Sequence, residues 1–230
     1  MKASFPGCIL YCFVFSVLLF ACTTTGMQKP GVKEEKQVAP AEVPTPQVYT
    51  KEQRETLDIF EQILEIYESA ENRQAAAQKA EVLYTRIITK YPDTPLAQES
   101  YWKLITISVR DYSPPAFDKA EAYYNEFMAK YPGSVLKNAV EQTLINSYAK
   151  HAEWGRLLKF CTPAFMKFKD KGIEPAPLVL FMYSDANYRL GNIIEAKEGF
   201  KAAMELYPNI SYGKMAKKRL EEIRQKAEKK

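Results

Sequence analysis

Few residues of this 230-residue chain have the type and spacing that catalysis needs. A nucleophile or general base works with a partner within hydrogen-bond reach, often in a recognisable motif. The single histidine, His151, lies near an expected helix junction, with no Cys or Ser of a known motif close to it. The nine glycines are scattered and form neither a Walker-type nor a Rossmann phosphate loop. We therefore expect no enzyme, with a lytic or hydrolytic activity on the cell wall as the alternative.

Metal and cofactor chemistry is equally unsupported by the residue types. One histidine and four cysteines exclude zinc-finger spacing and any multi-histidine metal site. The acidic pairs Glu34-Glu35 and Glu221-Glu222 are more typical of solvated charge than of a catalytic carboxylate pair. We expect no metal, no cofactor and no small-molecule substrate.

The first residues have the features of an export signal. Lys2 precedes an apolar run over residues 8–21, which is too short to cross a bilayer comfortably because a spanning helix needs about 20 residues. The run ends in Leu19-Phe20-Ala21-Cys22, which resembles the lipobox of bacterial lipoprotein signal peptides, although Phe20 is bulkier than usual. The alternatives are an ordinary signal peptide and an uncleaved anchor.

The lipobox resemblance implies that residues 1–21 are a signal peptide and that Cys22 becomes a lipidated N-terminus. Several acyl chains on one cysteine supply stable anchoring that a single chain does not. Thr23 stands where inner-membrane retention typically requires Asp, so the resemblance implies an outer-membrane lipoprotein that faces the periplasm. Residues 22–49 are rich in proline and small or charged residues, and we predict a disordered tether there, with an ordered strand at the domain edge as the alternative.

Composition favours a folded domain over residues 50–230. The chain is 47% hydrophobic and 13% aromatic, which excludes disorder throughout, and its length suits one or two domains. A formal net charge of +4, without a basic stripe that carries interleaved aromatics, gives no support for nucleic-acid binding. From Thr50 onward the apolar spacing is helical, and Thr50 with Gln53 predicts a capping box at the first helix.

Self-comparison reveals a repeat carried by a small residue and an aromatic residue four positions later. This spacing keeps both side chains on one helical stripe. The small residue allows close approach of two helix backbones, and the aromatic fills the space one turn on. We therefore interpret Cys161 as a packing residue rather than a reactive thiol. The four pairs are Ala80/Tyr84, Ala120/Tyr124, Cys161/Phe165 and Ala196/Phe200.

Three of the four units end in a Tyr-Pro pair, namely Tyr91-Pro92, Tyr131-Pro132 and Tyr207-Pro208. Proline cannot continue the hydrogen-bond ladder, so each pair predicts the end of a second helix. The third unit lacks the pair, and Pro163 lies inside its expected second helix, where we expect it to kink or start that helix.

The order apolar, small, aromatic and proline resembles the second helix of the tetratricopeptide repeat (TPR). Residues 186–208 match best, with Gly191 at the turn between helices, and the resemblance covers roughly residues 50–225. It implies an all-α, tetratricopeptide-like solenoid of about four helical hairpins plus a C-terminal capping helix. Long units, repeated Tyr-Pro and a lipobox together are similar to the tetratricopeptide lipoproteins of the outer membrane.

Within that group the chain resembles the β-barrel assembly lipoprotein (BamD-like) and, more loosely, the Tol–Pal-associated cell-division coordinator. The resemblance implies a non-catalytic scaffold that binds partner proteins during outer-membrane assembly. The alternative is a coordinator of envelope constriction or peptidoglycan synthesis with Tol–Pal-type partners, although the sequence before Thr50 lacks the glutamine-rich coiled coil of that coordinator.

The family also implies a concave groove, lined by first helices, that binds an extended peptide or a partner helix. Mapping the repeat onto this chain places two groups of side chains toward that groove, and Trp, Tyr and Arg are common interface anchors. Packing in the core is the alternative for Trp102 and Tyr188, and Asp185 with Arg189 could form a simple surface pair. The positions are Trp102, Val109, Tyr112, Phe181, Asp185, Tyr188 and Arg189.

The C-terminal stretch over residues 214–230 has eight basic and three acidic residues. With Met215, Leu220 and Ile223 it predicts a last amphipathic helix that closes the repeat stack with a polar outer face. The alternative function is attraction to anionic lipid head groups or to an acidic partner.

Overall fold

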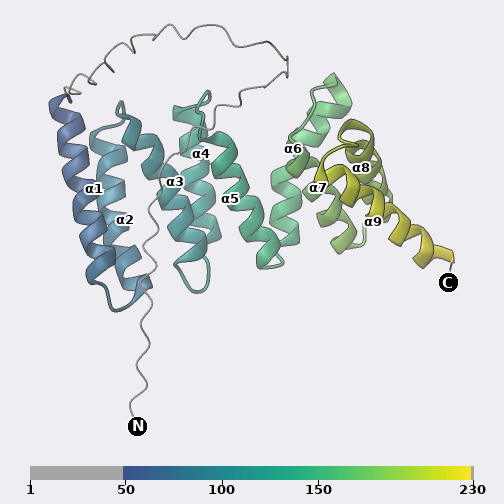
Figure 1. The fold of residues 1–230 in the computed structure, drawn as a ribbon, viewed down its shortest axis with the longest axis horizontal. Helices are drawn as coiled ribbons and strands as arrows, with labels where there is room; N and C mark the ends of the chain where they lie inside the picture. The colour runs from purple at the N-terminus through teal and green to yellow at the C-terminus, as the bar shows by residue number, and fades with distance from the viewer. Residues whose placement is uncertain (1–48, 229–230) are drawn as a thin grey trace, which may run out of the picture. The chain divides into compact units, whose positions relative to one another are not determined.

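The computed structural model describes residues 49–228, and every secondary-structure element among them is an α-helix. The predicted signal peptide at residues 1–21, the predicted lipidation site Cys22 and all of the predicted tether but Tyr49 lie outside the described residues. The helices appear in order along the chain in Figure 1. They are α1 (Lys51–Ser69), α2 (Arg73–Lys90), α3 (Pro95–Arg110), α4 (Phe117–Lys130), α5 (Lys137–Lys150), α6 (Trp154–Lys171), α7 (Pro177–Leu190), α8 (Ile193–Leu206) and α9 (Ser211–Glu228).

Local sequence explains where many of these helices begin and end. The predicted capping box at α1 is confirmed: Gln53 N–H donates to Thr50 Oγ1 at 3.2 Å, and the Gln53 side chain accepts from Thr50 N–H at 2.9 Å. Pro95 and Pro177 occupy the first positions of α3 and α7, where a missing N–H removes no helical bond. Gly191 ends α7 in the left-handed conformation, with φ 87°.

Successive helices pack in pairs, which we call hairpins 1 to 4: α1–α2, α3–α4, α5–α6 and α7–α8. Each hairpin also packs against the first helix of the next one, and α9 packs against both helices of hairpin 4. The α4–α5 junction is the exception, because these two helices touch over few residues. The first helices also meet, α3 against α5 and α7 against α9.

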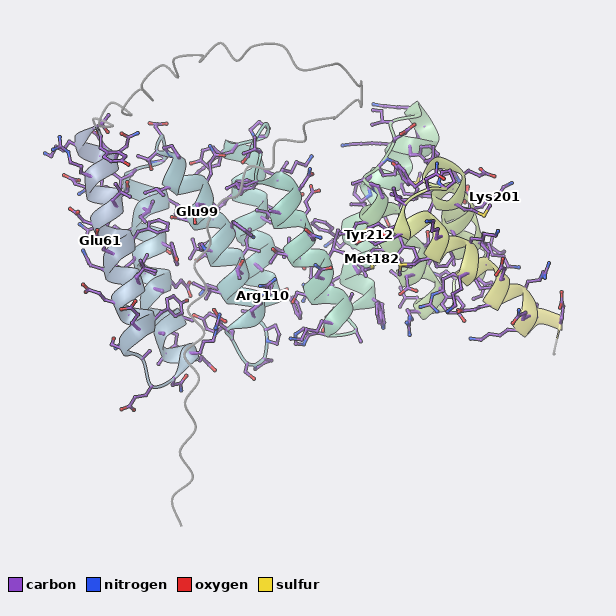
Figure 2. The ribbon with its side chains drawn as sticks, viewed as in Figure 1. Glu61, Glu99, Arg110, Met182, Lys201 and Tyr212 are labelled. Atoms are coloured by element: carbon purple, nitrogen blue, oxygen red, sulfur yellow. The ribbon has the colours of Figure 1, made fainter. Side chains whose placement is uncertain are left out.

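The core runs through all four hairpins. The small residues of the repeat, Ala80, Ala120, Cys161 and Ala196, are each 0% exposed and lie on α2, α4, α6 and α8. Side chains on the outer faces, such as Glu61 of α1 and Lys201 of α8, are exposed (Figure 2).

The aromatic residues of the repeat divide into two classes. Tyr84, Phe165 and Phe200 are buried, and each ring contacts a ring of a neighbouring helix. Phe165, for example, stacks on Tyr183 with 4.1 Å between ring centroids. Tyr124 is only half-buried. One of the four equivalent positions therefore faces a less filled environment than the other three.

Tyrosines of the Tyr-Pro pairs reach back to the preceding hairpin. Tyr131 Oη donates to the carbonyl of Pro92 at 2.6 Å, and Tyr207 Oη donates to the carbonyl of Pro175. Tyr91 belongs to the first hairpin of the described residues and donates instead to Glu55 on α1. We call the bonds made by Tyr131 and Tyr207 tyrosine locks, because each joins the end of one hairpin to the end of the hairpin before it.

Of the two expectations for Pro163, that it starts the second helix of the third unit is wrong, whereas a kink at Pro163 stays a prediction. It starts no helix, because α6 runs from Trp154 to Lys171 with Pro163 in its interior. Proline at this position removes one helical bond, to the carbonyl of Lys159. Both residues are exposed, so water can compensate for the lost donor.

Candidate partner-binding surfaces

The groove residues predicted on hairpin 2 are largely occupied by contacts within the chain. Trp102 is half-buried, and its indole Nε1 donates to Thr143 Oγ1 on α5 at 3.0 Å. Val109 is 1% exposed and is therefore unavailable to a partner. Tyr112 lies just after α3, and its hydroxyl donates to Glu81 on α2 at 2.6 Å.

The positions predicted on α7 contact the neighbouring helices. Phe181 is 3% exposed, and its ring lies 5.6 Å from that of Phe200 and 5.8 Å from that of Tyr212. Its place on the inner stripe of α7 explains the burial, since helical spacing gives the same pattern for a packed face and a binding face. Phe181, like Val109, is corrected from a groove position to a core position.

Asp185, Tyr188 and Arg189 form polar links around the end of α7. Asp185 is buried between Arg189, at 3.5 Å, and Arg219 of α9, at 3.6 Å. Tyr188 Oη accepts from Lys226 of α9 at 2.6 Å, and the Arg189 guanidinium lies 5.2 Å from the Trp154 ring. Arg189 is exposed and Tyr188 is half-exposed, so these two side chains form the accessible part of the predicted surface.

The structure brings together the predicted residues of each helix but not the two groups. The hairpin 2 group contacts α2 and α5, whereas the α7 group contacts α6, α8 and α9. Of the residues proposed as anchors, Trp102, Tyr112, Tyr188 and Arg189 keep some exposure.

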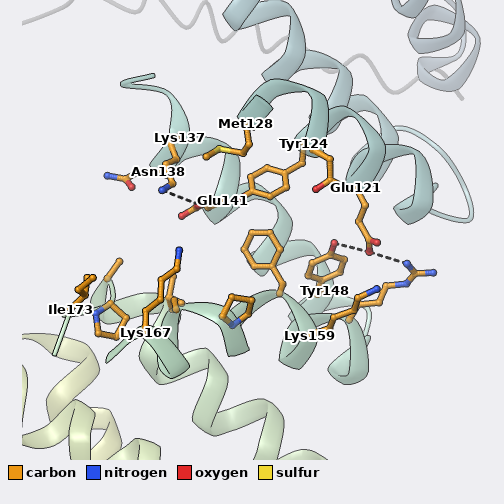
Figure 3. Close-up of a pocket in the computed structure, with 18 of the residues that line it drawn as sticks. Glu121, Tyr124, Met128, Lys137, Asn138, Glu141, Tyr148, Lys159, Lys167 and Ile173 are labelled. Atoms are coloured by element: carbon orange, nitrogen blue, oxygen red, sulfur yellow. Dashed lines mark hydrogen bonds and ion pairs between the residues drawn. The ribbon is translucent and has the colours of Figure 1, made fainter. Parts of the chain in front are cut away.

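A second surface, which the sequence did not predict, is a cleft of about 630 Å³ at the junction of hairpins 2 and 3. It is lined by α4, α5 and α6, by the α6–α7 connection and by Val179. Figure 3 shows Tyr124, Met128 and Glu141 on one side, with Lys159 and Lys167 on the other. The volume lies within the usual range of ligand pockets, about 300–1,000 Å³.

The apolar part of the cleft is aromatic. The half-buried Phe160 ring lies 5.2 Å from the Tyr124 ring and 6.1 Å from the Tyr148 ring. Phe160 therefore bridges hairpins 2 and 3 at the place where α4 and α5 pack poorly. Aromatic clusters with a polar end are typical of surfaces that bind other molecules.

Hydrogen bonds fix the two tyrosines of the cleft. Tyr124 Oη donates to Glu141 Oε1 at 2.9 Å, and Tyr148 Oη donates to Glu121 Oε1 at 2.9 Å. Burial, followed by interaction with these carboxylates, raises the pKa of both phenols, so they remain donors at physiological pH. Arg156 completes the link, since it lies 2.8 Å from Glu121 and 2.7 Å from Asp118.

Charge in the cleft is only partly neutralised. Lys137 lies 3.9 Å from Glu141, and Arg156 pairs with Glu121. Among the described residues, Lys159, Lys167 and Glu174 line the cleft without an ion pair. Both lysines belong to α6 and are exposed, so the α6 side of the cleft carries unopposed positive charge.

The cleft coincides with a missing tyrosine lock. Each second helix ends ten residues after its small residue, and the next residue is Tyr91, Tyr131, Gly172 or Tyr207. Gly172 adopts φ 65° and has no side chain to reach back toward hairpin 2. The absence of Tyr-Pro from the third unit was visible in the sequence and was the available signal for this site.

The residues first considered for catalysis do not meet. His151 is exposed, and its ring lies edge-on to Phe117 at 5.8 Å. Cys161 is buried, and burial, with the nearby Glu141 charge, raises the pKa of its thiol to about 12. Within residues 49–228, no three His, Cys, Asp or Glu side chains are grouped to hold a metal ion, and no helix is long and apolar enough to span a membrane.

Comparisons with known proteins assign no family to this chain. No family model matches the chain, and no curated protein or solved structure was found to be similar to it.

Proposed function

We propose that this protein is a non-catalytic scaffold whose helical repeats bind partner proteins. The observation that carries the proposal is the recurrence of one packed unit: a fully buried small residue on α2, α4, α6 and α8, with each helix ending ten residues later. This recurrence, together with the contacts between first helices, supports a tetratricopeptide-like solenoid. Such stacks expose long surfaces that suit extended partners.

The proposed location is the periplasmic face of the outer membrane, with a lipid anchor at Cys22. The sequence features that support it are the apolar leader, the lipobox-like Leu19-Phe20-Ala21-Cys22 and Thr23. Labelling cells with a palmitate analogue is expected to mark the wild-type chain and not the Cys22→Ser variant. Absence of label, or unchanged membrane fractionation of that variant, would reject the anchor.

The proposed pathway is assembly of the outer membrane, in a complex of the β-barrel insertion type. We expect affinity purification of the full-length chain from detergent-solubilised membranes to recover barrel-insertion components. Recovery of Tol–Pal or cell-wall synthesis proteins instead would favour the envelope-constriction role, and turnover of a cell-wall substrate would overturn the scaffold proposal.

A matched pair of variants tests whether the accessible first-helix residues take part. Arg189→Glu reverses the charge of an exposed side chain on the proposed surface. Lys197→Glu makes the same charge change at an exposed position of α8. We expect Arg189→Glu to reduce partner recovery and Lys197→Glu to leave it unchanged. Equal recovery with both variants would exclude Arg189 from the partner interface.

A further inference from the structure

We propose that the cleft between hairpins 2 and 3 binds an extended segment of a partner protein with the pattern acidic–x–apolar–x–acidic. This inference goes beyond the proposed function by adding a second surface, and it depends on that function only for the expectation that the partner is a protein. It requires neither lipidation of Cys22 nor a contribution from the predicted groove.

The cleft lies where the repeat departs from its usual pattern. At the other two junctions a tyrosine lock joins adjacent hairpins, through Tyr131 and through Tyr207. At this junction Gly172 takes the tyrosine's place, and α4 and α5 touch over few residues. The resulting cleft is open to solvent, and its volume of about 630 Å³ is enough to hold several side chains of a partner.

The charges of the cleft favour an acidic partner segment. Lys159 and Lys167 are exposed and unpaired among the described residues, whereas the acidic groups Glu121 and Glu141 already accept bonds from Tyr148 and Tyr124. The remaining unpaired acid of the cleft, Glu174, belongs to the α6–α7 connection rather than to α6. A partner segment that lies along α6 therefore meets positive charge, which selects acidic side chains.

The spacing of the two lysines matches that of the first and fifth residues in an extended chain. Lys159, Pro163 and Lys167 are four residues apart along α6, so the two lysines are separated by about 12 Å along the helix axis at 1.5 Å per residue. An extended chain rises about 3.3 Å per residue and covers that distance in roughly four residues. Its residues at positions one, three and five share a face, so two acidic side chains flank one central side chain.

The central side chain meets an apolar environment. Pro163 lies midway between the lysines, and Phe160 lies one turn before Pro163, with its ring against Tyr124. Burial of an aromatic or large aliphatic side chain there removes apolar surface from water, which favours binding. Charges at both ends and an apolar centre thus account for the proposed pattern.

The direct test is binding of a fluorescein-labelled peptide, Ser-Glu-Thr-Phe-Thr-Glu-Ser, to the full-length chain, followed by fluorescence anisotropy. We expect saturable binding that weakens as ionic strength rises. Replacing the peptide's Phe by Ser, or moving its second Glu by one position, is expected to weaken binding. Equal binding of all three peptides would overturn the proposed pattern.

Protein variants locate the site. Lys159→Glu with Lys167→Glu is expected to weaken peptide binding about tenfold or more. The control pair Lys197→Glu with Lys217→Glu makes the same change in net charge at exposed, unpaired positions outside the cleft. Equal loss in both pairs would show that the peptide senses only net charge and would overturn the assignment.

A steric variant gives an independent measurement. Asn138 is exposed and lines the cleft, whereas Asn146 is exposed on the same helix outside it. We expect Asn138→Trp to block the peptide and Asn146→Trp to leave its affinity unchanged, with circular dichroism confirming that both variants fold. Peptide binding that survives Asn138→Trp would overturn the proposal, and neither outcome depends on which envelope partner the protein has.

Discussion

The junction between hairpins 1 and 2 and the junction between hairpins 2 and 3 use the same repeat but are filled differently. At the first, α2 packs closely on α3, Glu81 accepts from Tyr112 and Tyr123, and Tyr131 reaches Pro92. At the second, α4 barely touches α5, and polar pairs and the Phe160 ring bridge an open space. The junction that has no tyrosine at the helix end is thus the one that contains the cleft.

The largest expected effect concerns solvent access from the cleft to the buried core next to it. Cys161 lies on α6, next to the cleft residue Phe160, and is 0% exposed. Burial raises the pKa of its thiol to about 12, which lowers the thiolate fraction near neutral pH roughly 10³-fold. In a chain that carries Cys8→Ser, Cys12→Ser and Cys22→Ser, Cys161 is the single cysteine left, and we expect it to react with a thiol reagent at least that much more slowly in native buffer than in denaturant. Rapid native reaction would mean that the junction opens down to the core.

The next largest effect compares equivalent aromatic positions away from the cleft and within it. Phe200 is 0% exposed, and Phe200→Ala is expected to lower the free energy of unfolding by about 3–5 kcal/mol. Tyr124 is half-buried beside the cleft, so Tyr124→Ala is expected to cost clearly less. Urea denaturation followed by circular dichroism measures both, and equal losses would mean that the cleft is packed as tightly as the other junctions.

A smaller effect is expected from removal of one tyrosine lock. Tyr131→Phe deletes the bond to the Pro92 carbonyl and keeps the ring in place. We expect a loss of about 0.5–1.5 kcal/mol in unfolding free energy. Tyr188→Phe, which removes a bond to exposed Lys226, is the control, with a smaller expected loss. If Tyr131→Phe changes nothing, the lock is not what closes the first junction.

The smallest effect concerns pH. Burial alone would raise the pKa of Glu81, but hydrogen bonds from Lys119, Tyr112 and Tyr123 outweigh it, so the pKa lies below its ordinary value. The carboxylate therefore stabilises the folded state above the unfolded pKa, about 4.3, and this stabilisation is lost as pH falls through the lower, folded pKa. Glu81→Gln is expected to flatten the acid limb of the stability curve. An unchanged acid limb would contradict this role of Glu81.

The helical class and many local details could be predicted from the sequence because they depend on neighbours along the chain. Capping at Thr50 needs only Gln53, three residues away. The burial of Val109 and Phe181 could not be predicted, because periodicity identifies an inward face without showing whether another helix covers it. The cleft requires knowledge of how two hairpins approach each other, which single-helix patterns do not contain.

Pro163 is a second position where the local sequence does not determine the structure. A proline in the middle of a helix predicts a kink or a new helix start, because it removes a donor and crowds the preceding turn. In this protein α6 continues through it, and both Pro163 and Lys159, whose carbonyl loses the donor, are exposed beside the cleft. Proline therefore removes a backbone hydrogen bond at this position but does not set a helix boundary.

The position of α5 has a mechanical consequence. Most of the packing that joins α1–α4 to α6–α9 passes through this one 14-residue helix. A small tilt of α5 relative to α3 would therefore be amplified with distance, so that the far end of α9 travels much further than any atom near α5. A ligand seated beside α5 would restrict this movement, and the angle between the two ends of the protein would then report whether the ligand is bound.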